Sequence, residues 1–154
     1  MHPVRGSLKK AASLRTAVLF LVALSAASCT VRLAADYDEE IDRAATALQQ
    51  DMDAHLTELE AIGSGAAAEY EASEAFYRNY GVRLRSVRLR AQGHPKNELT
   101  VQQLDRMADS VEELRRRHEE GGTLSPAFIS ATRELFNTGW AAVIGWEIAK
   151  KRGA

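Results

Sequence analysis

Beyond position 36, apolar residues recur at alternating spacings of three and four, which is the period of an amphipathic α-helix. The first such segment spans residues 37–62, where Asp36 or Asp38 is suited to cap the start and Gly63-Ser64-Gly65 ends the pattern. Its expected core positions are Ile41, Ala45, Leu48, Met52, Leu59 and Ile62, with His55 at the remaining position. The pattern predicts a long helix that buries one face.

A second segment with the same period spans residues 66–92 and ends at Gly93-His94-Pro95. Its periodic positions are Tyr70, Ser73, Tyr77, Tyr80, Leu84, Val87 and Ala91. Residues 82–90 also alternate as Val-Arg-Leu-Arg, which is typical of a β-strand. We favour a helix there because Ser86 breaks the alternation and the sequence shows no partner strand.

The third and fourth segments span residues 101–120 and 126–151. Thr100 with Gln103 forms a capping-box pattern before the third, and Ser125-Pro126 is a favourable start for the fourth. The third repeats apolar residues at Leu104, Met107, Val111 and Leu114. Apolar residues cover more than one face of the fourth, which we therefore expect to be the most buried helix, with Lys150, Lys151 and Arg152 facing its C-terminal dipole.

Four long helices joined by short loops predict an all-α fold, an antiparallel up-down-up-down four-helix bundle over residues 37–152. The charges give an independent argument for this order. Residues 36–62 carry nine acids and one base, whereas residues 78–90 carry five arginines and no acid. An antiparallel hairpin sets the acids at 38–42 level with Arg85, Arg88 and Arg90, so Glu39 and Arg88 should lie at the same end.

The N-terminal region has a different pattern. The first 28 residues contain four basic residues and no acid, and an apolar run at 16–23 leads into small residues. A basic start, a short apolar stretch and a small-residue cleavage site are typical of a secretory signal peptide. The chain thus divides into a signal peptide at 1–28, a tether at 29–36 and the helical domain at 37–152.

Residues 24–29, Leu-Ser-Ala-Ala-Ser-Cys, resemble the bacterial lipobox read by the lipoprotein signal peptidase. Ala27 and Ser28 match its small residues, while Ala26 stands where the family pattern prefers Leu, Val or Ile. The resemblance implies that Cys29 is lipidated with diacylglycerol, becomes the first residue after cleavage and is acylated again, with palmitate among its acyl chains.

Two other interpretations of this region stay open. One is an ordinary cleaved signal peptide with a chance cysteine, and the other is an uncleaved membrane anchor. A spanning helix needs roughly 20 apolar residues, and the uncharged stretch at 16–31 is shorter than that. On residues 1–29 alone, the chain resembles small uncharacterised bacterial lipoproteins. Thr30, in place of aspartate, implies the outer membrane facing the periplasm, or the outer face of the cytoplasmic membrane if the host has one membrane.

Composition narrows the function further. Without its first 28 residues the chain has 16 basic and 21 acidic residues, a formal charge of −5, which argues against nucleic acid as a partner. Cys29 is the only cysteine, so the chain can form no intramolecular disulfide and no thiolate metal cluster.

The sequence contains few residues or motifs suited to catalysis. No Glu-x-x-His motif and no Gly-x-Ser-x-Gly motif occurs, so the sequence predicts no catalysis, no cofactor and no metal. Asp51, His55 and Glu58 share one helical surface but make a poor metal set, and we expect His55 at a helix contact, bonded to a tyrosine. We expect His118 to cap carbonyls or face water, and His94 to be exposed.

We therefore expect a lipid-anchored cell-envelope protein with a structural or protein-interaction role. Its partners would be the membrane, through lipidated Cys29, and another envelope protein. The alternative is a helical bundle that binds a small ligand at the membrane surface, with Tyr70, Tyr77 and Tyr80 lining a pocket between helices. An enzyme would need His55 beside two carboxylates.

Overall fold

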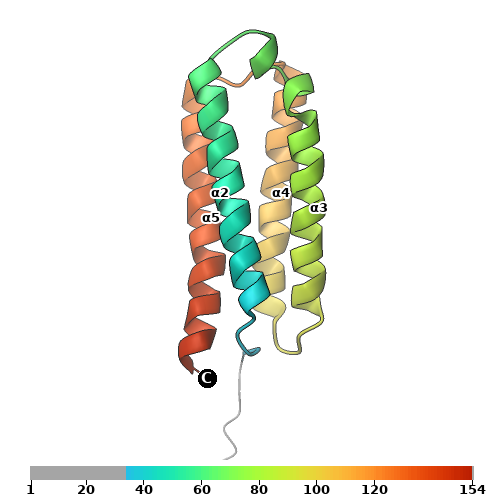
Figure 1. Ribbon diagram of the computed structural model, residues 1–154, viewed down its shortest axis with the longest axis vertical. Coiled ribbons are helices and arrows are strands. Elements are labelled where there is room, and N and C mark those ends of the chain that lie inside the picture. The colour runs from blue at the N-terminus through green and yellow to red at the C-terminus, as the bar shows by residue number, and fades with distance from the viewer. Residues whose placement is uncertain (1–33, 154) are drawn as a thin grey trace, which may run out of the picture. The chain divides into compact units, whose positions relative to one another are not determined.

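The computed structural model describes residues 34–153 and contains four long helices (Figure 1). They are α2 (Glu39–Ile62), α3 (Tyr70–Gln92), α4 (Glu98–Gly121) and α5 (Pro126–Gly153), with a short 3-10 helix, η1 (Ala66–Ala68), before α3. No strand occurs within the described residues, so the alternation at 82–90 belongs to a helix. None of these helices is both long and apolar enough to cross a membrane.

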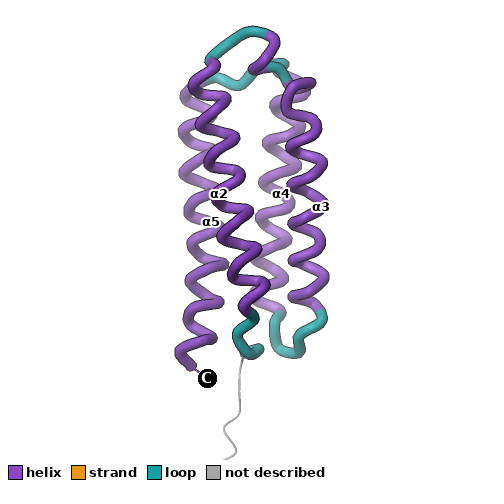
Figure 2. The backbone as a smooth tube through the Cα atoms, viewed as in Figure 1, coloured by secondary structure: helices purple, strands orange, loops and turns teal. Residues whose placement is uncertain are grey.

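The helices form an antiparallel up-down-up-down bundle, as predicted (Figure 2). Each helix packs against its neighbours in the chain, and α2 also packs against α5, which closes the bundle. We call the end formed by residues 35–38, the α3–α4 turn at 93–97 and the last turn of α5 the entry end (Figure 1). The loops at 63–69 and 122–125 form the far end.

Three helix boundaries follow the sequence signals. Asp38 caps α2, because its Oδ1 accepts hydrogen bonds from the backbone N–H of Glu40 at 2.8 Å and of Ile41 at 3.3 Å. Gly63 ends α2 in the left-handed region, with a φ of 71°. The Ser125 hydroxyl accepts a bond from the Phe128 N–H at 3.3 Å, which caps α5 as expected.

The starts of α3 and α4 differ from the prediction. α3 begins at Tyr70, because residues 66–68 form η1 and Glu69 is extended. α4 begins at Glu98 after Asn97, three residues earlier than expected. The expected capping box is wrong because Thr100 lies inside the helix, fully buried, and its hydroxyl donates to Glu147 of α5 at 3.0 Å.

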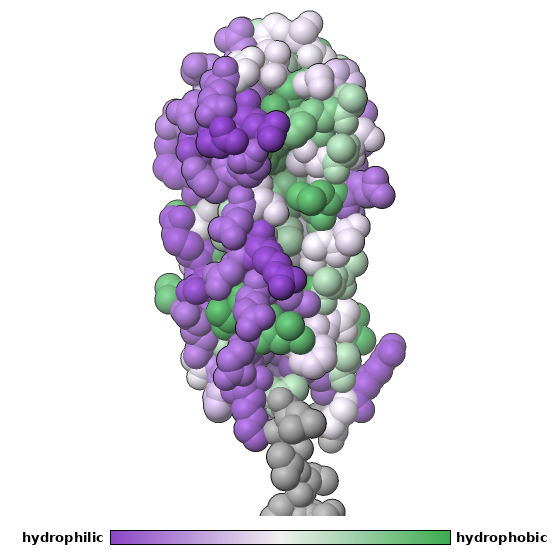
Figure 3. Space-filling view, turned by 180° about the vertical axis from the view of Figure 1, so that it is seen from behind, coloured by the Kyte–Doolittle hydropathy of each residue, from purple (hydrophilic) through white to green (hydrophobic). Residues whose placement is uncertain are grey.

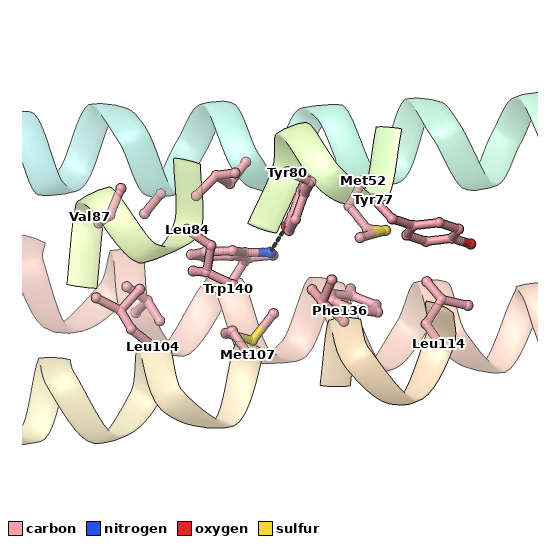
Figure 4. Close-up of a cluster of buried hydrophobic side chains, with 14 of the residues drawn as sticks. Met52, Tyr77, Tyr80, Leu84, Val87, Leu104, Met107, Leu114, Phe136 and Trp140 are labelled. Atoms are coloured by element: carbon pink, nitrogen blue, oxygen red, sulfur yellow. Dashed lines mark hydrogen bonds between the residues drawn. The ribbon is translucent and has the colours of Figure 1, made fainter. Parts of the chain in front are cut away.

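The core is a continuous column of apolar side chains from all four helices (Figure 4). Trp140, Tyr80 and Phe136 are its largest fully buried members. The Trp140 indole N–H donates to the Tyr80 hydroxyl at 3.0 Å, so both aromatic polar groups are satisfied inside the core. In α2 the fully buried side chain beside Met52 is Leu56 rather than His55, and Ile62 is 36% exposed.

The expectation that α5 is the most buried helix is wrong. Like the other helices it buries one face, formed by Ile129, Thr132, Phe136, Trp140, Val143, Glu147 and Lys150. Leu135 and Ile148 remain 55% and 37% exposed. Lys150 does not face solvent at the helix end, because it turns into the bundle and pairs with Glu147.

The charge argument gives the correct orientation and some of the pairs. Arg90 Nε lies 2.7 Å from Asp38 Oδ2, which joins α3 to the start of α2. Arg88 instead pairs with Asp105 of α4, and Glu39 pairs with Arg43 within α2. Charge distribution thus predicts which helix ends meet, whereas the individual partners depend on which face each arginine occupies.

Candidate functional site

A groove of about 290 Å³ runs between α3 and α4, and we call it the α3–α4 groove. Its floor consists of buried or half-buried side chains, namely Tyr77, Leu84, Ala108 and Val111, together with Gly81. Its rim is charged and mostly exposed, with Glu74, Arg78, Arg85, Glu112 and Arg115. An apolar floor below a charged rim is the usual composition of a small-ligand site.

Arg115 holds the part of the groove nearest the far end through one hydrogen bond and two ion pairs. Arg115 Nη1 donates to the Tyr70 hydroxyl at 3.3 Å, and the same guanidinium pairs with Glu112 at 2.6 Å and Glu119 at 2.7 Å. The hydrogen bond to Glu112, reinforced by those to Tyr70 and Glu119, raises the pKa of Arg115. Arg115 therefore closes one end of the groove, and its donors are already engaged.

The opposite part of the rim is open. Arg78, Gly81 and Arg85 lie at i, i+3 and i+7 along α3 and so share one face. Arg78 has only a long contact to Glu74, at 3.6 Å. Arg85 forms no ion pair with a residue in 34–153, and its Nη1 would lie 3.4 Å from a Cβ at Gly81. The Arg85 guanidinium thus lies over bare backbone, and no residue of the described part of the chain accepts from its donors.

A buried hydrogen-bonded chain lies behind the floor. The Tyr77 hydroxyl is 2.9 Å from His118 Nδ1, and His118 Nε2 is 2.9 Å from the carbonyl oxygen of Ala68. Because a carbonyl only accepts, the His118 Nε2–H donates to Ala68, and in this tautomer Nδ1 can accept from the Tyr77 hydroxyl. His118 is fully buried, so the expectation that it faces water is wrong, whereas the expected bond to a carbonyl is found at Ala68. Burial also raises the pKa of Tyr77, which keeps the phenol protonated.

His55 lies on the other side of α3, in the groove between α2 and α3. Its ring stacks on Phe76 with 3.8 Å between centroids, and its buried Nε2 has no hydrogen-bond partner among the described residues. The predicted bond between His55 and a tyrosine is wrong, since Tyr77 bonds His118 instead. Burial, with a smaller contribution from His118, lowers the pKa of His55 to about 4.

The structure separates the three tyrosines of the predicted pocket. Tyr70 and Tyr77 border the α3–α4 groove together, with 6.1 Å between ring centroids. Tyr80 is buried in the core, where it accepts from Trp140 and borders the α2–α3 groove. The pocket thus keeps two of its three expected tyrosines and stays a prediction as a ligand site. Cys29, the predicted lipidation site, lies outside the described residues.

The other ionisable candidates have structural partners. Asp51, His55 and Glu58 border the same α2–α3 groove, but Asp51 pairs with Arg83 there. Within residues 34–153 no group of three or more His, Cys, Asp or Glu side chains is arranged to hold a metal ion. His94 is half-buried, and its Nε2 lies 2.8 Å from Asp38 Oδ2. His94 and Arg90 therefore contact the same carboxylate, that of Asp38, which also caps α2.

A buried ion pair at the entry end was not predicted from the sequence. Lys150 Nζ lies 2.6 Å from Glu147 Oε1 and donates to Asn97 Oδ1 at 3.0 Å, and Thr100 also donates to Glu147. The Lys150 and Glu147 side chains are 1% and 0% exposed. One signal could have revealed the pair, because positions 136, 140, 143, 147 and 150 continue a single three-four stripe.

A second groove, of about 490 Å³, lies between α4 and α5 and is mainly apolar. Phe128, Ala131, Leu135 and Phe136 line it from α5, and Leu114 lines it from α4. We call it the α4–α5 groove. Figure 3 shows this face of the molecule, where hydrophobic side chains follow α5 and hydrophilic ones cover the last turns of α4.

Comparison of the chain with protein-family models, with curated proteins and with solved structures finds no match in any of the three. Functional inference therefore depends on the two grooves, the buried polar groups and the N-terminal sequence.

The buried ion pair predicts a large difference between single and double variants. Lys150→Met should lower the free energy of unfolding by about 3–5 kcal/mol, because it leaves the buried Glu147 side chain without its ion-pair partner. Adding Glu147→Leu should restore most of that loss. Lys151→Met is the matched control, since Lys151 is exposed and only lies over the Tyr37 ring. Urea unfolding measures all three, and equal losses in the single and double variants would contradict the prediction.

His55 predicts a loss of stability at mildly acidic pH. Its folded pKa of about 4 lies below the unfolded value of 6.5, so the unfolded chain binds the proton first and stability is lost as the pH falls through this window. Between pH 7.5 and pH 5 this group should cost about 2 kcal/mol, at 1.36 kcal/mol per pKa unit. His55→Phe should show a smaller loss in urea unfolding over the same interval. A loss as large as that of the wild type would rule His55 out as the cause.

Proposed function

We propose that the protein is a lipid-anchored component of the bacterial cell envelope with a structural or protein-interaction role and no catalytic activity. The observation that carries the anchor is the N-terminal pattern that ends at Cys29. Three acyl chains on one cysteine would hold the protein at a membrane, since each buried methylene contributes about 0.8 kcal/mol and a single chain anchors only marginally. Thr30 favours the outer membrane, on the periplasmic side.

The entry end supports a short distance between anchor and bundle. The backbone N–H of Ala35 donates to the carbonyl of Lys96 at 2.9 Å, so the chain is already attached to the bundle there. Ala35 lies six positions after Cys29, and six steps along the chain reach at most about 20 Å when fully extended. An anchored bundle would therefore stay near the lipid headgroups, and its partner would lie at or in the same membrane.

The α4–α5 groove supports the interaction role. Leu135 is 55% exposed beside half-buried Phe128, in the larger and more apolar of the two grooves. Exposed apolar surface of this kind marks protein-contact sites on soluble domains, and a groove between two helices suits a third, amphipathic helix. We propose that an amphipathic helix of another envelope protein occupies it.

The second candidate function is binding of a small ligand at the membrane surface. It is favoured by the α3–α4 groove, which is bordered by Tyr70 and Tyr77 and by Arg85, a guanidinium that forms no ion pair with a residue in 34–153. The two functions use different faces of α4 and can be tested separately.

Substitution of Cys29 tests the anchor. Cys29→Ser should abolish incorporation of radiolabelled palmitate and should leave unprocessed precursor or soluble protein, because the acceptor thiol is gone. Labelling of cells followed by membrane fractionation measures both effects. Unchanged labelling and processing in this variant would end the lipoprotein proposal.

Site-specific photocrosslinking tests the interaction role. A photoreactive residue at Leu135 should give one discrete adduct in the native envelope, and Ala131→Arg, which fills the groove, should remove that adduct. Val82 of α3 is the matched control, because it is 50% exposed but lies outside the α4–α5 groove. Adducts of equal yield from Leu135 and Val82, or an adduct that persists with Ala131→Arg, would contradict the proposed groove.

A further inference from the structure

We propose that the α3–α4 groove binds an organic anion with an apolar body, whose charged group lies between Arg78 and Arg85 above Gly81. This inference deepens the second candidate function and rests on it. The ligand class is defined by its chemistry, a carboxylate or phosphate attached to a compact hydrocarbon. Three features of the groove lead to this class: the arginine without an acidic partner, the glycine at position 81 and the apolar floor.

The charge balance of the groove favours an anion. Three arginines and two glutamates line it, and both glutamates already pair with Arg78 and Arg115. Arg85 is left as a guanidinium with five donors and no acceptor among the described residues. An arginine with free donors over a partly apolar surface is well suited to bind a carboxylate or phosphate in a two-pronged hydrogen bond.

Gly81 gives the Arg85 guanidinium room at the edge of the groove. Glycine within a helix costs about 1 kcal/mol relative to alanine. The backbone here does not require glycine, because its φ is not positive and an added Cβ would meet only the Arg85 Nη1, at 3.4 Å. Packing of the bundle therefore does not explain the residue. A bare stretch of helix between two arginines does explain it, because the Arg85 guanidinium lies over the backbone there, at the edge of the groove, where a ligand can meet it.

The floor requires an apolar body on the ligand. Leu84 and Val111 are buried on either side of half-buried Ala108, and the Tyr77 hydroxyl is directed to His118, so the tyrosine offers its ring to the groove. No free polar side chain of the floor remains to bind a sugar or a peptide. The volume of about 290 Å³ lies at the lower end for ligand pockets and suits a short chain or a single ring.

Binding can be measured on the full-length chain that carries Cys29→Ser, so that no attached lipid competes for the groove. The probes are 4-phenylbutyrate and octanoate, which distinguish an aromatic acid from a lipid-like acid, the neutral 4-phenylbutyramide, and acetate alone. We expect at least one of the two acids to bind at least tenfold more tightly than both the amide and acetate, with amide NMR shifts concentrated in residues 77–85 and 108–115.

Variants then locate the site. Arg85→Gln should weaken binding at least fivefold, and Gly81→Leu should abolish it by filling the groove, with circular dichroism to check that the helices persist. Arg106→Gln is the matched control, since Arg106 is an exposed arginine of α4 outside the groove, and it should leave affinity unchanged. If Gly81→Leu fails to fold, the comparison of Arg85→Gln with Arg106→Gln still tests whether the ligand binds in the groove.

The outcomes separate this inference from the function on which it rests. Equal affinity for 4-phenylbutyrate and 4-phenylbutyramide would overturn the anion site but leave a ligand-binding bundle. Unchanged affinity in Arg85→Gln would likewise overturn the proposal that the charged group of the ligand lies between Arg78 and Arg85. No binding of any probe would overturn both the inference and the second candidate function, whereas the lipid anchor would be unaffected.

Discussion

The bundle depends on one constraint: the polar side chains that reach into its core need partners inside the protein, and most of them have one. Burial of an unpaired polar group costs free energy comparable to a lost hydrogen bond. Trp140 meets Tyr80 halfway along the core, Tyr77 meets His118 near the far end, and Lys150 meets Glu147 at the entry end. The first two contacts each join two helices, and the Lys150–Glu147 pair joins α5 to the start of α4 through Thr100 and Asn97. These links fix the axial positions of the helices, which apolar packing alone specifies less sharply.

The helices, most of their ends and their antiparallel order could be predicted from the sequence. The apolar period and the capping residues depend on nearby positions, and the charge argument depends only on the total charge of each segment. The polar partners could not be predicted. Periodicity places Glu147 and Lys150 on the buried stripe of α5. A charged residue considered by itself, however, is expected to face solvent. The acceptor of His118 is Ala68, fifty residues away, and no local pattern encodes that contact. The early start of α4 could not be predicted for the same reason, because the Thr100 hydroxyl bonds Glu147 of α5 and does not cap its own helix.

The candidate site was predicted in part for the same reason. Tyr70, Tyr77 and Tyr80 share one helix, yet the three-four spacing turns Tyr80 toward Trp140 and leaves the other two facing α4. The groove itself arises where Gly81 of α3 lies across from Ala108 of α4, a coincidence of two small residues on different helices. Only the register between α3 and α4 reveals it.

Asp38 has a mechanical consequence. Its carboxylate caps α2, contacts Arg90 of α3 and lies 2.8 Å from His94 in the following turn. Burial would raise its pKa, but the hydrogen bonds from Arg90, Ile41 and Glu40 hold the pKa below its ordinary value, so the group stays ionised. A tensile load on the chain ahead of Ala35 would meet this junction before it reached the first turn of α2. The force would be shared between two antiparallel helices in shear, so that α2 would resist being peeled from the bundle.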